Sequence, residues 1–317
     1  MTPPPPARPS ARQPLSWPVT LKLTAAAVLP ALAVYAVAGA LMVPAVAAGT
    51  VLGLAGTMLG SSRRAAAGGL LVMALMALHQ ALPALDLRLL AVAPAIAAGW
   101  EAARTGGRAL PLALMSMGLL VALDHAGAPP ARTLPFYAGG LALALPAARA
   151  LGFHARPKPA PEGLHAGIRQ GLFLALGLAL AVTIAGHLQS AHAIWVVQFF
   201  VLRALAPGHL ALPSAAKFFA GVLVGTALAA LLEQAGLSVP PLSFAIALAA
   251  AVIGLRLLPL GPPYTPAAFT VALLLLTAPT PDAALFRSEA ALIASVLAVS
   301  LAFGLGRLIR DPGRTSA

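Results

Sequence analysis

The charged and polar side chains that could do chemistry in this chain stand at the ends of long apolar runs or just inside them. Arg64 and Lys217 each open such a run. A cation in that position either anchors a membrane helix, with its stem snorkelling to the headgroups, or draws an organic anion to the mouth of a transporter. Anchoring is the first interpretation, and attraction of an anion is the alternative.

Polar residues further inside the runs form a second group of candidates. Gln198 follows Trp195 by three residues, so the pair can offer a hydrogen bond and a stacking ring to an aromatic acid. Arg203 interrupts the same run, and His79 suits either an interface or a proton relay. Glu233 lies near the far end of its run, where we expect an interfacial carboxylate, with proton coupling as the alternative.

Glu101 and Arg104 are three residues apart, directly after Trp100. This spacing predicts a local ion pair on one helix face, with substrate binding or coupling as the alternative role of Glu101. Cysteine is absent, and the seven histidines form no cluster with metal-ligand spacing. We therefore expect no metal and no cofactor, and because no catalytic set can be assembled, no enzyme.

The composition identifies the class of protein that positions these residues. Of 317 residues, 60% are hydrophobic and 9% are charged, and the mean hydropathy is +0.92. A soluble domain is about 25% charged. The chain is therefore expected to be an all-α polytopic membrane protein with the lipid bilayer as its partner. The net charge of +12 comes from residues at the ends of apolar runs, which indicates membrane topology rather than nucleic-acid binding.

The apolar runs predict about twelve transmembrane helices joined by short loops. Thr24–Gly60 contains no charged residue and as one helix would be roughly 55 Å long, about twice the hydrocarbon thickness, so it must fold back near Gly39. No phosphate-binding loop of the GxxxxGK[ST] type is present, so ATP hydrolysis by this chain is not expected. The expected segments are 22–40, 42–60, 65–84, 87–103, 109–124, 134–152, 168–187, 191–206, 217–236, 240–258, 264–279 and 288–307.

Basic residues recur between the two halves of the chain. Lys22 and Arg169 open the first and seventh segments, Arg64 and Lys217 the third and ninth, and Arg132 and Arg287 precede the sixth and twelfth. These pairs predict two parallel six-helix repeats. If the chain is a transporter, its site is expected between the repeats, and a cavity there lined by Trp195, Gln198 and Lys217 would support that function. The expected regions are a disordered cytoplasmic tail 1–21, a first repeat 22–153, a cytoplasmic linker 154–166, a second repeat 167–310 and a cytoplasmic tail 311–317.

The charge distribution also predicts the orientation. With the N-terminus in the cytoplasm, 17 of the 20 lysines and arginines fall at cytoplasmic ends. Adding or removing one helix would scramble this partition, which supports both the count and a cytoplasmic position for both termini.

Four stretches of the second half resemble a known family. They read IWVVQFFVLRALAPG, KFFAGVLVGTALAALL, YTPAAFTVALLLL and FRSEAALIASVLAVSLAFG. In this order they resemble the fusaric acid resistance protein-like (FUSC) membrane domain of the aromatic acid exporter superfamily. The positions that fit the family pattern are Trp195, Gly221, Gly225, Thr226, Tyr264 and Arg287.

The chain also departs from the family pattern. Lys217 stands where the family has arginine, and Ala294 where it has glycine. The first half keeps Arg64 and Gly68 but has Val72 in place of the second glycine.

Small residues of the pattern suit helix packing. Gly221 and Gly225 lie on one helix face, where we expect close contact with a neighbouring helix. Gly68 is expected to act likewise in the first half. Thr226 is expected to bond back to its own helix.

The resemblance implies a multi-pass protein of the bacterial inner membrane that exports aromatic or other small organic acids, with Tyr264 among the candidate substrate contacts. We expect the proton gradient to drive it. Some relatives work with a periplasmic adaptor protein and an outer-membrane channel, and a homo-oligomer is left open. The alternative is a non-transporting subunit or scaffold of an envelope assembly.

Overall fold

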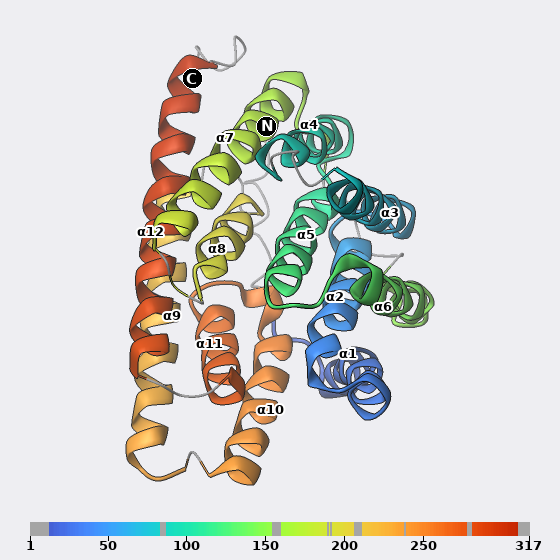
Figure 1. Ribbon diagram of the computed structural model, residues 1–317. Helices are drawn as coiled ribbons and strands as arrows, with labels where there is room; N and C mark the ends of the chain where they lie inside the picture. Colours follow the sequence, from blue (N-terminus) through green and yellow to red (C-terminus); the bar gives the residue numbers. More distant parts are fainter. Residues whose placement is uncertain are drawn as a thin grey trace, which may run out of the picture.

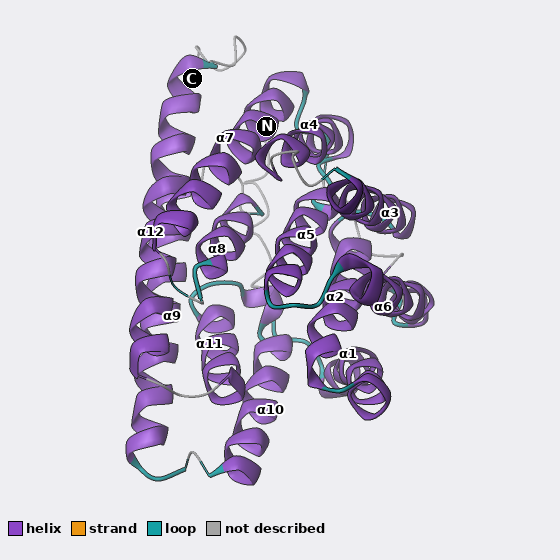
Figure 2. Ribbon diagram, viewed as in Figure 1, coloured by secondary structure: helices purple, strands orange, loops and turns teal. Residues whose placement is uncertain are grey.

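The computed structural model describes residues 13–82, 87–153, 160–188, 190, 192–205, 211–237, 239–277 and 281–309. Within these ranges every regular element is helical and no strand occurs (Figure 2). The α-helices are α1 (Trp17–Ala38), α2 (Val43–Leu59), α3 (Ser62–Ala81), α4 (Leu87–Thr105), α5 (Ala109–His125), α6 (Pro130–Ala150), α7 (Leu164–Leu188), α8 (Ile194–Ala204), α9 (Ala211–Gln234), α10 (Pro240–Arg256), α11 (Tyr264–Thr277) and α12 (Pro281–Leu308).

Each expected segment corresponds to one of these helices, and the predicted fold-back is confirmed. Gly39 follows α1 with φ 79, a left-handed value that suits glycine, and a short 3₁₀ turn, Ala40–Met42, leads into α2. The helix α1 begins at Trp17, inside the stretch 1–21 expected to be a disordered tail. The Arg256 guanidinium lies 4.0 Å from the centre of the Trp17 ring, and Pro18 occupies the first turn, where proline is tolerated. Residues 1–12 lie outside the described part of the chain.

Six helices of the described part are long and apolar enough to cross a membrane. The shorter apolar helices include α8, which has 11 residues and is therefore roughly 16 Å long, about half the hydrocarbon thickness. Its Trp195, Val196 and Phe200 are buried, so α8 is enclosed by other helices. The six candidate spans are Trp17–Ala38, Ala40–Leu59, Ser62–Ala81, Leu164–Leu188, Leu212–Gln234 and Asp282–Leu308.

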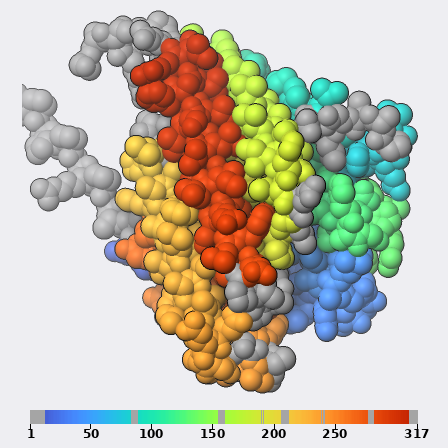
Figure 3. Space-filling view, turned by 60° about the vertical axis from the view of Figure 1, so that its left-hand side comes forward, coloured from blue at the N-terminus to red at the C-terminus, as the bar shows by residue number. Residues whose placement is uncertain are grey.

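The two halves of the chain lie side by side, with α1–α6 on the right of Figure 1 and α7–α12 on the left. In the first half α2 packs against α6, and α3 against α5. In the second half α8 packs against α12, and α9 against α11. Figure 3 shows α12 flanked by α9 and α7 on one continuous face. The halves meet chiefly where α4 packs on α7, and also through α5 with α8 and α1 with α10.

Contacts between helix ends show which ends lie together on each of two opposite sides of the molecule. The Arg108 N–H donates to the Leu59 carbonyl at 3.0 Å, which joins the end of α2 to the start of α5. On the other side, His79 Nε2 lies 3.9 Å from Asp124 Oδ2, which joins the ends of α3 and α5. We name these two sides of the molecule the Arg108 end and the Asp124 end.

Candidate functional site

A groove between α3 and α4 brings together two of the predicted site residues, Arg64 and Glu101. It lies towards the Arg108 end and has a volume of about 530 Å³, which is within the range that holds one small organic molecule. Its polar end carries two arginines, one glutamate and one tryptophan, and the rest of its wall is apolar. The lining residues are Arg64, Ala67, Ala93, Ile96, Ala97, Trp100, Glu101, Arg104 and Leu110.

Glu101 forms the floor of the groove and ties three helices together. Its Oε1 accepts a hydrogen bond from the Ala109 N–H at 3.2 Å, and its Oε2 accepts one from the Leu110 N–H at 2.9 Å. These two donors open α5, so the carboxylate caps the positive end of that helix. Arg64 Nη1 lies 3.8 Å from Glu101 Oε1, and the Glu101 side chain is only 2% exposed.

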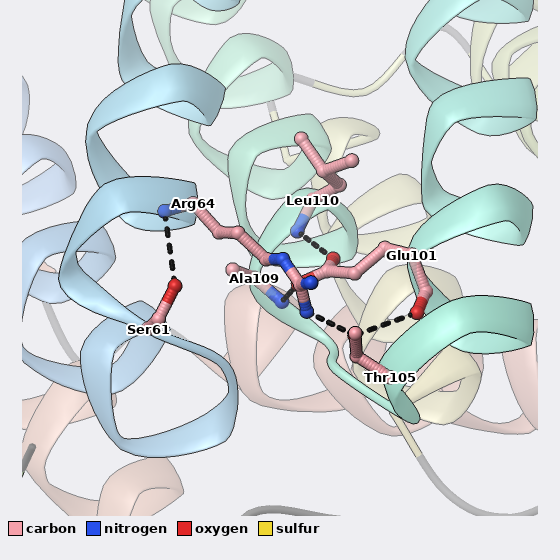
Figure 4. Close-up of polar contacts among 6 residues, drawn as sticks. All are labelled: Ser61, Arg64, Glu101, Thr105, Ala109 and Leu110. Carbon is pink, nitrogen blue, oxygen red and sulfur yellow. Dashed lines mark hydrogen bonds and ion pairs between the residues drawn. The ribbon is translucent and has the colours of Figure 1, made fainter. Parts of the chain in front are cut away.

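Arg64 is held at the edge of the groove by the end of α4. Its Nη1 donates to Thr105 Oγ1, and that hydroxyl donates in turn to the Glu101 carbonyl at 2.9 Å (Figure 4). At the start of α3 the Ser61 hydroxyl accepts the Arg64 N–H at 3.3 Å, a side-chain cap of this helix. The Arg64 side chain remains 35% exposed, so its guanidinium is both oriented and accessible.

Arg104 does not form the predicted local pair with Glu101. Its guanidinium lies 4.5 Å from the centre of the Trp100 ring, one helical turn back. Glu101 turns instead towards α5 and Arg64, because two backbone donors and a fixed guanidinium satisfy a buried carboxylate better than one exposed side chain. The result is a cation lying on an exposed indole beside a neutralised carboxylate.

A contact between Arg108 and Glu162, not predicted from the sequence, joins the start of α5 to the segment just before α7, beside this groove. Arg108 Nη2 donates to Glu162 Oε1. The Glu162 N–H also donates to the Ala102 carbonyl at 3.2 Å, at the end of α4. The Gly106-Gly107 pair before Arg108 indicates the turn between α4 and α5, but no local spacing in the sequence pairs Arg108 with Glu162.

A second cavity, of about 580 Å³, lies at the Asp124 end between α4 and α5 of the first half and α7 and α8 of the second. Its wall is apolar apart from His125 and Ser190, among the residues the structure describes. The helix α8 contributes Ile194 and Val197. Trp195, Gln198 and Lys217, which were considered for a cavity between the halves, do not line this one.

Trp195 belongs instead to a packed aromatic cluster around Arg287. The Arg287 guanidinium lies 5.0 Å from the Trp195 ring centre and 4.8 Å from that of Phe199. Arg287 Nε donates to Thr270 Oγ1 at 3.2 Å, and His192 stacks on Trp195 with ring centres 4.5 Å apart. Arg287 is 7% exposed, so this cation connects α8, α11 and α12 inside the protein.

The small residues of the resemblance lie at close helix contacts. A side-chain carbon at Gly221 would meet the Pro263 carbonyl oxygen, and one at Gly225 would lie 2.5 Å from the Ala267 carbonyl oxygen. Both contacts set α9 against the chain at α11. Thr226 accepts a hydrogen bond from Ser288 of α12 at 3.3 Å.

Gly68 occupies the corresponding place in the first half. A side-chain carbon there would lie 3.1 Å from Ala113 Cβ, so Gly68 faces α5. The third helix of each half thus uses a glycine to approach the fifth.

Replacing Arg287 with alanine is expected to lower the free energy of unfolding by about 2 kcal/mol, because a large side chain packed on two rings is removed from a buried site. Unfolding of the purified protein in detergent, followed by circular dichroism against denaturant, measures the change. Arg132 lies in α6 as Arg287 lies in α12, is exposed, and is the matched control. An equal effect of Arg132→Ala would contradict a special role for the aromatic cluster.

The remaining predicted residues lie away from both cavities. Arg203 is buried under Phe218 at 3.9 Å from its ring centre, and its Nη1 donates to the Ser214 carbonyl at 2.8 Å. Lys217 and Tyr264 are exposed. Half-buried positions are occupied by His79, Gln198 and Glu233.

These features define an all-helical membrane protein with an arginine-bearing groove at one end and an apolar cavity at the other. No protein-family model, no curated protein and no solved structure matches the chain. The resemblance to the FUSC domain therefore stays a prediction from the residues quoted above.

Proposed function

We propose that this protein is a secondary transporter that exports aromatic or other small organic acids across the bacterial inner membrane, driven by the proton gradient. The observation that carries the proposal is the groove of Arg64, Trp100 and Arg104. Two guanidiniums and an indole beside an apolar wall match a carboxylate joined to an aromatic or aliphatic body.

The two cavities support a transport role because they lie on opposite sides of the same helices. Both are lined by α4 and α5, the groove towards the Arg108 end and the second cavity at the Asp124 end. On α5, Leu110 lines the groove and Leu114, one turn further along, lines the second cavity. A small displacement of α4 and α5 is therefore positioned to pass a bound molecule from one cavity to the other.

The proposed architecture is twelve transmembrane helices in two parallel six-helix repeats, with the short α8 enclosed by its neighbours. Corresponding contacts support it: α2 with α6 and α8 with α12, α3 with α5 and α9 with α11, and α4 with α7 and α10 with α1. This pattern is what a pseudo-twofold axis along the membrane normal produces.

We place the Arg108 end in the cytoplasm. The positive-inside rule supports this orientation, since Arg63, Arg64, Arg104, Arg108 and Arg203 stand at or near that end. The groove would then receive its anion on the side where export begins. A periplasmic adaptor protein and an outer-membrane channel are the proposed partners, as the resemblance implies.

Proteoliposomes test the proposal directly. Vesicles with an acidic lumen are expected to accumulate radiolabelled aromatic acids by exchange for protons, and an uncoupler abolishes this uptake. Passive permeation of the neutral acid runs to the alkaline side, so the direction of accumulation separates the two routes. Empty liposomes give the background.

The groove is tested in the same assay by removing one of its cations. Arg104→Gln is expected to lower the initial rate about tenfold, the loss of roughly one charge-assisted contact. Arg63→Gln is the matched control, because Arg63 is exposed on the same end and does not line the groove. No uptake across a broad panel of acids would reject export and favour the scaffold function.

A further inference from the structure

The groove between α3 and α4 opens sideways, towards the face of the molecule that lipid covers. Ile96 and Trp100, which line it, are 63% and 57% exposed. Leu70 of α3 and Leu89 of α4 are 62% and 64% exposed. Large apolar side chains with this exposure on two membrane helices face lipid rather than water.

The groove has one polar end and one apolar end along the membrane normal. Arg64, Glu101 and Arg104 lie at the Arg108 end, whereas Ala93 lies about three turns before Arg104 along α4. From Ala93 to Arg104 the helix rises roughly 16 Å, about half of a hydrocarbon core. The groove therefore extends along approximately one leaflet.

The alanine-lined part of the groove has room for an alkyl chain, and the polar end of the groove can bind a charged head group. Ala67, Ala93 and Ala97 form a shallow wall, because each side chain is a single methyl group. At the polar end Arg104 lies on Trp100, the type of residue that sits at the headgroup level of a bilayer. Glu101 is satisfied chiefly by the start of α5, so Arg104 and the exposed part of the Arg64 guanidinium remain available to an outside anion.

We propose that this groove is a lateral entry site for single-chain anionic amphiphiles, which reach it from the leaflet at the Arg108 end with the carboxylate at Arg64 and Arg104 and the tail along the alanine wall. The proposal names the ligand class and the access route of the groove described under the proposed export function. It rests on that function only in treating the groove as an entry site for transport. Binding itself does not depend on transport.

The ligand class follows from the shape and charge of the groove together. A water-soluble acid would leave the alanine wall facing lipid. The alkyl chain of an amphiphile partitions into the leaflet with about 0.8 kcal/mol per CH₂ relative to water, which concentrates the ligand beside the groove, and it can then lie along the alanine wall. A cationic amphiphile would meet two guanidiniums. A phospholipid shares the anionic head and apolar tail, and it differs by a second chain for which a groove between two helices offers no matching wall.

Quenching of Trp100 fluorescence by a brominated carboxylate tests the site. The protein is reconstituted in phosphatidylcholine nanodiscs with Trp17 replaced by phenylalanine, since Trp17 is 49% exposed whereas Trp195 is 7% exposed. Added 12-bromododecanoate is expected to quench saturably, and unlabelled dodecanoate restores the signal. The Trp100→Phe variant in the same background reports any quenching that does not come from the groove.

Three variants separate the groove from general surface charge. Arg104→Gln is expected to raise the half-saturating concentration about tenfold, and Arg63→Gln to change it less than about twofold. Ala97→Leu keeps both arginines and fills the groove, so it is expected to abolish saturable quenching while helicity by circular dichroism is retained. Equal effects of Arg63→Gln and Arg104→Gln would overturn the site.

The competitors decide the ligand class. Dodecylamine competing as well as dodecanoate would overturn anion selectivity. Phosphatidylglycerol displacing the acid equally well would show a lipid headgroup site and overturn the single-chain assignment. Binding without transport in proteoliposomes would keep this inference and reject the proposed exporter, whereas transport of acids without quenching would reject the lateral site alone.

Discussion

Replacing Glu101 with alanine is expected to lower the free energy of unfolding by about 3 kcal/mol, because two backbone donors and a guanidinium lose a buried partner at once. The Ala109 and Leu110 N–H groups at the start of α5 have this carboxylate as their acceptor, and Arg64 Nη1, which also donates to Thr105, lies 3.8 Å from it. Chemical denaturation of the purified protein in detergent, followed by circular dichroism, measures the loss.

Glutamine at the same position separates hydrogen bonding from charge. Glu101→Gln keeps one acceptor oxygen for the start of α5, so its loss is expected to be about half that of alanine. Glu289→Ala is the matched control, since Glu289 is exposed and its removal changes the net charge equally. Equal losses for Glu101→Ala and Glu289→Ala would contradict the role of Glu101 as the junction of α3, α4 and α5.

The sequence predicted the helices well because apolar runs in a membrane protein have sharp physical limits. A run without charge longer than the bilayer must fold back, and Gly39 was the residue able to take the left-handed turn. The exception is instructive. The run around Trp195 was expected to form a segment over 191–206, yet α8 has only 11 residues, and its Arg203 contacts Ser214 and Phe218 inside the protein.

The candidate site was predicted only in part, because side-chain partners depend on contacts that no local spacing encodes. Arg64 and Glu101 were both candidates, but the sequence paired Glu101 with Arg104, its neighbour on the same helix. The actual partners are Arg64, 37 positions upstream on α3, and backbone N–H groups at the start of α5. Composition cannot show which helix ends share one side of the molecule with a groove between them.

The predicted site residues on α8 likewise could not be placed from local sequence spacing. Trp195 and Gln198 were expected to face a cavity between the halves. In the structure Ile194 and Val197 line the cavity, and Trp195 contacts His192 and Arg287. The Trp195 ring packs best where other rings and a cation surround it, and this packing fixes which side of the 11-residue α8 faces the cavity.

The junction of the two halves gives the second large expected effect. A side-chain carbon at Gly167 of α7 would meet Ala103 Cβ, and one at Gly99 of α4 would lie 2.5 Å from the Gly167 carbonyl oxygen. Both obstacles are rigid, so Gly167→Ala is expected to lower the free energy of unfolding by about 2–3 kcal/mol through overpacking. Denaturation in detergent measures it.

Gly186→Ala is the matched control on the same helix, since a side-chain carbon there meets nothing within 4 Å. Its expected effect is neutral or a stabilisation of up to about 1 kcal/mol, the helix preference of alanine over glycine. The two variants therefore shift stability in opposite directions although the chemical change is identical.

Because α4 lines both cavities and packs on α7, Gly167→Ala is also expected to slow any transport that needs α4 to move against α7. If Gly167→Ala keeps the stability of the wild type, close packing at Gly99 and Gly167 does not hold the two halves together.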